Sequence, residues 1–229
     1  MKKSVYSLAL GDNVIRAVDK EAYRLGTSRS NLVNQILAEY LSVETPEMRM
    51  KSTFSRLIEL MDSSFQVQDN RNDSVLLRSA LPYKYRPTIS YRVQIFREQG
   101  EYYGRFSAEI RTQNEALTDL FRTFFWNWQE IESRLLWRHG CREYSAGIGR
   151  SSFSRSLYNN SGLDEARMGE AIAGYLSFLD SALKDFLENH RSFAEVGGRL
   201  EEEYGRLLEN SVIEAITFAG TDEMKFKGG

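Results

Sequence analysis

The densest group of side chains able to bind an anion lies in residues 137–156, WRHGCREYSAGIGRSSFSRS. This segment combines arginines, glycines and serines with a single acidic residue, Glu143. Arginine suits phosphate and carboxylate groups because its planar guanidinium forms paired hydrogen bonds with them, and small residues let a ligand approach the backbone. The segment therefore predicts either an anion site or a loop with solubilising charges. The candidate ligands are Arg138, Arg142, Arg150 and Arg155.

Other reactive residue types are scarce. The chain has one cysteine, Cys141, and two histidines, His139 and His190. A single cysteine cannot form an intramolecular disulfide, and so few thiol and imidazole groups predict no structural zinc site. His139 and Cys141 are too close along the chain to be oriented as a catalytic pair, and the glycines at 147 and 149 lack the Gly-Lys-Ser/Thr of a phosphate loop. We expect no catalytic residue, no metal and no cofactor, and hence no enzyme.

The composition is that of a globular protein. The chain has 229 residues, of which 41% are hydrophobic and 12% aromatic. Because 30 Lys and Arg stand against 32 Asp and Glu, the net charge is -2 and any nucleic-acid binding has to be local. No apolar run approaches the roughly 18 residues that span a bilayer, and the first residues lack a continuous apolar signal segment. We expect a cytoplasmic protein without membrane contact.

The first forty residues predict a strand followed by two helices. Apolar residues recur at helical spacing after Asp12, Gly26 can end the first helix, and Thr27 or Ser28 can cap the second. Such a short segment buries too little apolar surface to fold alone, so we expect it to dimerise. The large residues of the strand and one face of each helix form the predicted dimer core, Tyr6, Leu8, Leu10, Val14, Val18, Leu32 and Ile36.

This segment carries a family resemblance. Residues 2–41, KKSVYSLALGDNVIRAVDKEAYRLGTSRSNLVNQILAEYL, resemble the ribbon-helix-helix DNA-binding domains of the Arc, MetJ and CopG repressor type. The features that carry it are the alternation in the strand and the entry to the second helix, Gly26-Thr27-Ser28-Arg29-Ser30-Asn31-Leu32-Val33. The resemblance covers less than a fifth of the chain. It implies that two copies pair their strands into an antiparallel ribbon that enters the DNA major groove.

The resemblance also implies which residues contact DNA. Residues facing the bases would be Lys3, Val5, Ser7 and Ala9, although family members usually carry larger polar side chains here and Ser7 is the only polar residue within the strand. The amino end of the second helix offers free N–H groups and a positive dipole to phosphates. The predicted phosphate contacts are Lys2, Thr27, Ser28, Arg29 and Ser30.

The remaining residues predict a second, larger domain. Thr45-Pro46 ends the second helix, so residues 43–47 are predicted as a linker, 48–220 as the domain and 221–229 as a flexible tail. Residues 66–73 are polar and predict a loop, whereas 89–95 and 102–110 alternate around Gln99-Gly100 and predict a hairpin. We interpret the polar face of this hairpin, with Arg92, Gln94, Arg105, Glu109 and Arg111, as solvated rather than as a second nucleic-acid surface.

Three long helical stripes complete the predicted domain. They begin near Asn114, near Ser161 or Asp164, and near Val196. The predicted fold class is α+β, with an amino-terminal ribbon-helix-helix joined to a mostly helical domain that contains a β-hairpin.

We therefore expect a homodimeric DNA-binding transcriptional regulator, most simply a repressor, that binds double-stranded DNA. Its carboxy-terminal domain would oligomerise, giving a tetramer as the alternative to a dimer, or bind an unidentified small-molecule or protein effector. One alternative is an accessory DNA-binding protein of plasmid mobilisation or partition. Another is an antitoxin, which the aromatic-rich carboxy-terminal part disfavours because toxin-binding tails are normally short.

Overall fold

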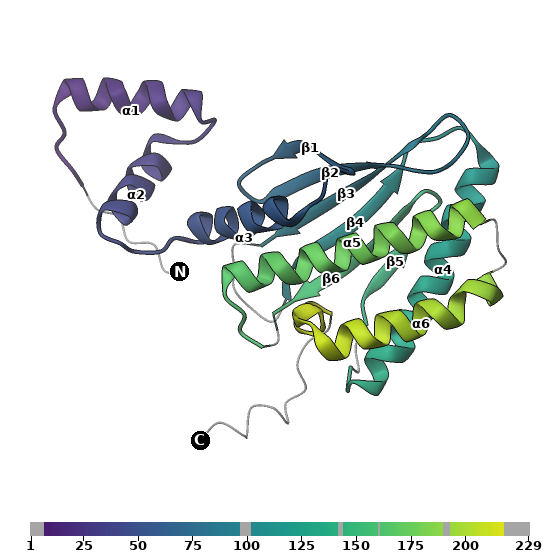
Figure 1. Ribbon diagram of the computed structural model, residues 1–229. Coiled ribbons are helices and arrows are strands. Elements are labelled where there is room, and N and C mark those ends of the chain that lie inside the picture. Colours follow the sequence, from purple (N-terminus) through teal and green to yellow (C-terminus); the bar gives the residue numbers. More distant parts are fainter. Residues whose placement is uncertain (1–6, 97–101, 142–143, 160, 190–192, 218–229) are drawn as a thin grey trace, which may run out of the picture. The chain divides into compact units, whose positions relative to one another are not determined.

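The computed structural model describes residues 7–96, 102–141, 144–159, 161–189 and 193–217. The chain divides into two compact units, Met1–Arg49 and Met50–Gly229 (Figure 1). The first unit contains α1 (Asp12–Arg24) and α2 (Arg29–Tyr40), and α3 (Pro46–Leu60) begins in it and continues into the second. The predicted linker at 43–47 therefore overlaps the start of α3. In the described residues no helix combines the length and the apolar content needed to cross a membrane.

The turn between α1 and α2 has the geometry expected from its residues. Gly26 has a φ of 61°, and the Thr27 N–H donates to the Ala22 carbonyl at 2.9 Å. Glycine adopts this helix-ending conformation without strain because it has no Cβ. Ser28 then caps α2, since its side chain accepts a hydrogen bond from the Asn31 N–H at 3.2 Å.

The predicted ribbon-helix-helix is wrong. The chain begins with three helices, and residues 7–10 have no strand conformation. A strand needs the backbone donors and acceptors of a neighbouring strand. The described strands all belong to one sheet of the second unit, and residues 7–10 are not part of it. Val5 and Tyr6 of the predicted strand, and the predicted DNA contacts Lys2 and Lys3, lie outside the described residues.

The second unit is built on a six-stranded antiparallel sheet with the strand order β1-β2-β3-β4-β6-β5. The strands are β1 (Phe65–Asn70), β2 (Ser74–Ala80), β3 (Thr88–Ile95), β4 (Tyr102–Ile110), β5 (Ala146–Ile148) and β6 (Ser152–Tyr158). Besides most of α3, the helices of this unit are α4 (Glu115–Arg138), α5 (Glu165–Asn189) and α6 (Phe193–Asn210), followed by the short 3-10 helix η1 (Val212–Ile216).

Helices α4 and α5 pack on one face of this sheet, and α6 lies beside them (Figure 1). The contacts are largely aromatic. Phe125 of α4 stacks on Phe153 of β6 with ring centroids 4.5 Å apart, and Tyr175 of α5 meets Phe106 of β4 edge-on at 5.4 Å. Because side chains alternate across a strand, this face takes the apolar residues and the opposite face takes their polar neighbours.

The prediction of a mostly helical second domain with one hairpin is also wrong. The hairpin β3–β4 is present, but β1 and β2 extend it on one side and β6 and β5 on the other. The sequence predicted a loop at 66–73 instead of strand β1, because an edge strand needs few apolar residues. Strand β6, SFSRSLY, was hidden because Arg155 stands at an inward position between Phe153 and Leu157, where the alternation predicts an apolar residue.

The close approach of β4 to β3 predicts that a side chain at position 104, now Gly104, would destabilise the protein. A Cβ at this position would lie 2.1 Å from the Gln94 carbonyl oxygen. We expect Gly104→Ala to lower the free energy of unfolding by about 2–4 kcal/mol, because the backbone of β3 can move away only by breaking hydrogen bonds of the sheet. The matched control is Gly198→Ala in α6, where a Cβ meets nothing within 4 Å and a gain of up to about 1 kcal/mol is expected. Denaturant unfolding measures both, and equal effects would contradict this account of Gly104.

Candidate functional site

The first unit has an open apolar groove between α1 and α2. It has a volume of about 470 Å³. Four of the predicted dimer-core residues, one pair from each helix, come together in it, although they are distant in sequence. The residues that line the groove are Asn13, Val14, Ala17, Val18, Glu21, Leu32 and Ile36. Of the other predicted core residues, Leu8 and Leu10 are exposed and Tyr6 lies outside the described residues.

This unit leaves an unusual share of its apolar surface open. In the described part of the chain, most large apolar side chains that are exposed belong to residues 8–43. Leu32 is buried, but Val14 is 44% exposed and Ile36 is 49% exposed on the opposite helix. A contiguous apolar surface of this kind is typical of a site that contacts a protein, a membrane or a ligand. The groove is therefore the best-formed candidate for an interface in the first unit.

The predicted DNA-contacting residues of this unit are accessible in the described part of the chain. Ser7, Ala9, Ser28, Arg29 and Ser30 are exposed, and Thr27 is half-buried, whereas Lys2, Lys3 and Val5 lie outside the described residues. Arg29 donates a hydrogen bond to Asp19 at 2.8 Å. An exposed ion pair of this type is worth at most about 1 kcal/mol, so the guanidinium can exchange this partner for a phosphate.

The structure does not gather the predicted anion ligands. Arg138, at the end of α4, lies 3.5 Å from Glu201, and Arg150 donates to Glu115 at 3.3 Å. Arg155 points into the core, and Arg142 lies outside the described residues. Each described arginine of this set has its own acidic partner, so these three do not form one site.

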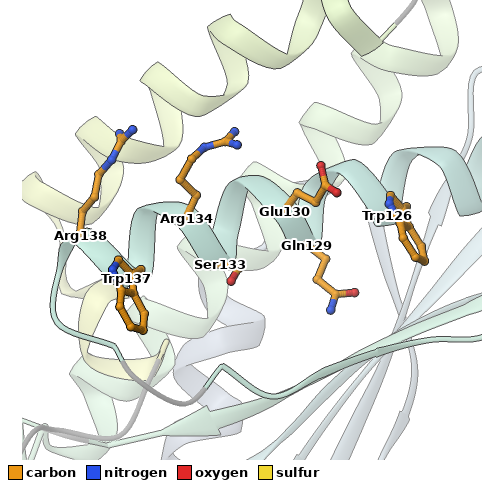
Figure 2. Close-up of a pocket in the computed structure, with 7 residues that line it drawn as sticks. All are labelled: Trp126, Gln129, Glu130, Ser133, Arg134, Trp137 and Arg138. Carbon is orange, nitrogen blue, oxygen red and sulfur yellow. The ribbon is translucent and has the colours of Figure 1, made fainter.

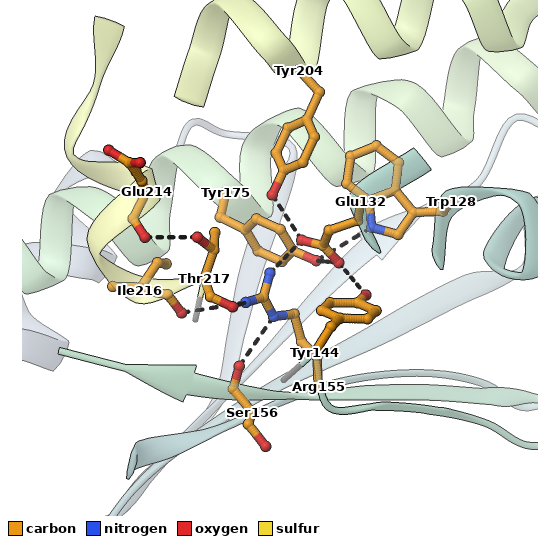
Figure 3. A network of polar contacts seen from close by, with 10 residues as sticks. All are labelled: Trp128, Glu132, Tyr144, Arg155, Ser156, Tyr175, Tyr204, Glu214, Ile216 and Thr217. Carbon is orange, nitrogen blue, oxygen red and sulfur yellow. Dashed lines mark hydrogen bonds and ion pairs between the residues drawn. The ribbon is translucent and has the colours of Figure 1, made fainter. Parts of the chain in front are cut away.

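Sequence reasoning missed the buried polar network around Glu132 and Arg155 (Figure 3). The two side chains form an ion pair and are both fully buried. Glu132 also accepts hydrogen bonds from Tyr204 at 2.7 Å, from Tyr175 at 3.4 Å and from Tyr144. The carboxylate thus has four donors, which offset the cost of removing its charge from water.

Arg155 is satisfied on its other side by backbone carbonyls. Its guanidinium donates to Ser156 at 3.1 Å, to Thr217 at 2.6 Å and to Ile216 at 3.3 Å (Figure 3). Its Cζ also lies 4.8 Å from the centre of the Tyr175 ring, a cation–π distance. One side chain of β6 therefore joins the carboxyl end of η1, at Ile216 and Thr217, to the sheet.

The network shifts the pKa values of its members. Burial and the adjacent Glu132 carboxylate raise the pKa of Tyr144 and of Tyr204 well above that of free tyrosine, and the pKa of Tyr175 is raised for the same reasons. Burial alone would lower the pKa of Arg155, but the negative charge of Glu132 raises it well above its usual value. All four donors therefore keep their protons, as the hydrogen bonds to Glu132 require.

A second buried carboxylate, Asp180 of α5, joins that helix to the other half of the sheet. It accepts hydrogen bonds from Tyr91 at 2.8 Å and Ser79 at 3.1 Å and pairs with Lys184 at 2.6 Å. Burial and this carboxylate raise the pKa of Tyr91 well above its ordinary value. With their partners inside the protein, Asp180 and Glu132 hold the core together rather than binding a ligand.

A signal for these networks was present in the sequence. Glu132 stands among Trp128, Ile131 and Leu135 on the apolar stripe of α4, and Arg155 stands at an inward position of β6. Charged residues are almost never fully buried unless they are paired. Two opposite charges at core positions therefore predict a buried ion pair, although the pattern does not show which of several such residues form it.

The outer side of α4 carries a shallow hollow of about 730 Å³ (Figure 2). Trp126 and Trp137, 62% and 68% exposed, point to the same side of the helix because eleven residues are close to three turns. Arg134 turns towards α6, where it lies 2.7 Å from Glu201 and lowers the pKa of that carboxyl. Every lining residue comes from this one helix. The hollow is thus an open surface and lacks the enclosure that a small-molecule pocket needs.

Comparison of the chain with models of known protein families, with curated proteins and with solved structures found no match. Within the described residues, no group of three or more His, Cys, Asp or Glu side chains is placed to hold a metal ion.

The buried ion pair predicts strong coupling between Glu132 and Arg155. We expect Glu132→Gln and Arg155→Met each to lower the free energy of unfolding by about 3–5 kcal/mol, because each leaves an opposite charge buried without its partner. The double variant removes both charges, so its loss should be clearly smaller than the sum of the two single losses. Denaturant unfolding of the four proteins measures this coupling, and additive losses would contradict it.

The buried tyrosines predict a loss of stability at alkaline pH. Tyr91, Tyr144, Tyr175 and Tyr204 have raised pKa values in the folded protein. Above pH about 10 the unfolded chain releases these protons and the folded chain retains them. The unfolded state then binds fewer protons, so stability is full below that pH and falls as pH rises further. Denaturant unfolding between about pH 8 and 11 should show this fall, and it should be shallower in Tyr204→Phe. A constant stability over this range would refute the prediction.

Proposed function

We propose that this protein is a homodimeric DNA-binding protein that regulates transcription, most simply as a repressor. The observation that carries the proposal is the apolar groove between α1 and α2, in which Val14, Val18, Leu32 and Ile36 meet and Val14 and Ile36 remain exposed. A unit of two short helices needs further burial to be stable. The resemblance of residues 2–41 to dimeric DNA-binding domains supports a second copy as the partner.

A second copy of this unit suits the groove for a physical reason. In a two-fold contact both chains present the same surface. The exposed apolar side chains at the groove, such as Val14 and Ile36, can therefore pack into the groove of a second copy. The polar residues at the groove, Asn13 and Glu21, can remain at the rim. Dimerisation through this groove would bring two α2 helices into one assembly.

The DNA contact is proposed at the amino end of α2. Ser28, Arg29 and Ser30 are exposed there, next to backbone N–H groups that a helix leaves unpaired in its first turn. Residues 1–42 also have more basic than acidic side chains, unlike the rest of the chain. A dimer would present two such ends and could bind two half-sites of a palindrome. This role would place the protein in the cytoplasm.

The second unit is proposed to act as the oligomerisation or effector part. It has a large core of its own, built from the sheet and α3–α6. A tail that folds only around a toxin would not have such a core, so this observation disfavours the antitoxin alternative. The accessory role in plasmid mobilisation or partition differs from regulation in the DNA that is bound, and selection of genomic fragments separates the two.

The test is selection of genomic DNA fragments by the purified full-length protein at physiological salt. Regulation predicts enrichment of a short palindrome upstream of genes, whereas the accessory role predicts fragments from a transfer or replication origin. Arg29→Ala should weaken binding to all sequences and lower the salt dependence of log K by about 0.9 for each phosphate that is no longer neutralised. Arg122→Ala is the control, because Arg122 is an exposed arginine on α4 with a similar acidic partner, Asp119.

The dimer is tested with Ile36→Asp, which puts a charge into the groove. We expect a monomer by analytical ultracentrifugation and a loss of DNA affinity of at least about 10-fold. Tyr23→Ser, at an exposed residue outside the groove, should leave both unchanged. Absence of any enriched fragment, or a dimer that survives Ile36→Asp, would overturn the proposal.

A further inference from the structure

The face of the sheet turned away from the helices is polar. Tyr91, Val93 and Phe106 point to the core, so their neighbours Arg92 and Arg105 point to the other face. On β2, Leu77 is buried among the core residues and its neighbour Arg78 shares the outer face. The outer face of β2, β3 and β4 therefore has one arginine on each strand.

The strand register places these three arginines on a diagonal. Arg78 pairs across the strands with Ser90, which is two residues from Arg92. Arg92 in turn pairs with Ser107, which is two residues from Arg105. Diagonal neighbours on a sheet face are about 7–8 Å apart, so the guanidinium groups form a regular row across the three strands.

The arginines of this row differ from most others in the second unit, which have acidic partners. In the described residues no hydrogen bond or ion pair joins Arg78, Arg92 or Arg105 to another side chain, and the Nε of Arg78 is buried without a partner. Two acids share this face with the row: Glu109, which pairs across the strands with Ser90 and lies 3.8 Å from Arg111, and Asp69, which lies 2.7 Å from Arg71. The row thus keeps a local positive charge although the whole protein has a net charge of -2.

The residues around the arginines indicate which anion would bind. Ser90, Ser107 and Ser154 lie beside the row and offer hydroxyl donors. The outer-face positions of β2 and β3, both fully described, carry no aromatic side chain. Stacking on aromatic rings is the usual way in which a sheet binds the bases of single strands. On β2 and β3, arginine and serine without interleaved aromatics instead suit a row of phosphates on a duplex.

We propose that the outer sheet face binds the phosphate backbone of double-stranded DNA through Arg78, Arg92 and Arg105. This inference rests on the proposed DNA-binding function and adds to it a second contact that is independent of base sequence. The amino-terminal unit would select the site, and the sheet face would add affinity on the flanking duplex. It also revises the interpretation of Arg92 and Arg105 as merely solvated.

The experiment measures how the affinity for a duplex depends on salt. Each phosphate contact contributes about 0.9 to the slope of log K against log salt concentration. Arg78→Gln/Arg92→Gln/Arg105→Gln in the full chain should therefore reduce the slope by about 2–3 per chain, with the preferred sequence unchanged. Arg92→Gln alone should reduce it by about 0.9 and serves if the triple variant unfolds. The matched control removes three helix arginines, Arg122→Gln/Arg167→Gln/Arg206→Gln, and should leave the slope unchanged.

The outcomes separate this inference from the proposed function. An unchanged slope in a folded triple variant, with Arg29→Ala still weakening binding, would overturn the sheet contact and leave the proposed function standing. Loss of slope in the triple variant, without any effect of Arg29→Ala, would support the sheet contact and overturn the amino-terminal DNA contact. A larger effect of the triple variant on single-stranded than on duplex DNA would overturn the assignment to a duplex.

Discussion

The second unit depends on the buried ion pair between Glu132 and Arg155. Glu132 comes from α4 and Arg155 from β6, while their hydrogen-bond partners come from α5, α6 and the segment around η1. A charge in the core is tolerable only while every partner is in place, because desolvation is costly and the compensation is geometric. One pair therefore requires the sheet, three helices and the end of the described chain to adopt a single arrangement.

Arginines act in opposite ways on the two faces of the sheet. On the helix face, Arg155 has an acidic partner, carbonyl acceptors and no access to solvent. On the outer face, Arg78, Arg92 and Arg105 stand in a row without side-chain partners among the described residues. The same side chain therefore stabilises the fold where its charge is matched inside, and remains available to an external anion where its charge is left unmatched. The one-sided packing of the helices creates this difference.

The first unit is held by different means. Its helices have well-formed ends at Gly26 and Ser28, yet the groove between them stays open and apolar. Local backbone preferences are sufficient for two helices and a turn, but a stable core needs more apolar contact than forty residues supply. In the proposed function the two units have different roles, since the second unit has a large core of its own and the first would gain further burial from a second copy.

Local signals determined much of the helical structure from sequence. The cap at Asn114 and the turn at Gly26 act within a few residues, and the sequence located them. It also located the hairpin β3–β4, whose two strands alternate clearly. Val14, Val18, Leu32 and Ile36 were predicted as dimer-core residues because helical spacing places them on one face of each helix, and the structure brings these four together in the groove.

Tertiary structure decided the rest. The polar edge strand β1 forms only because β2 supplies its hydrogen bonds, whereas residues 7–10 alternate in the same way as a strand but have no strand conformation and are not part of the described sheet. The sequence predicted Arg155 as a ligand for an anion. In the structure its charge is buried because it pairs with Glu132, twenty-three residues away. The row of Arg78, Arg92 and Arg105 exists only through the register of three strands. Pairing between distant residues leaves no local pattern, because its free energy comes from partners that only the folded chain brings together.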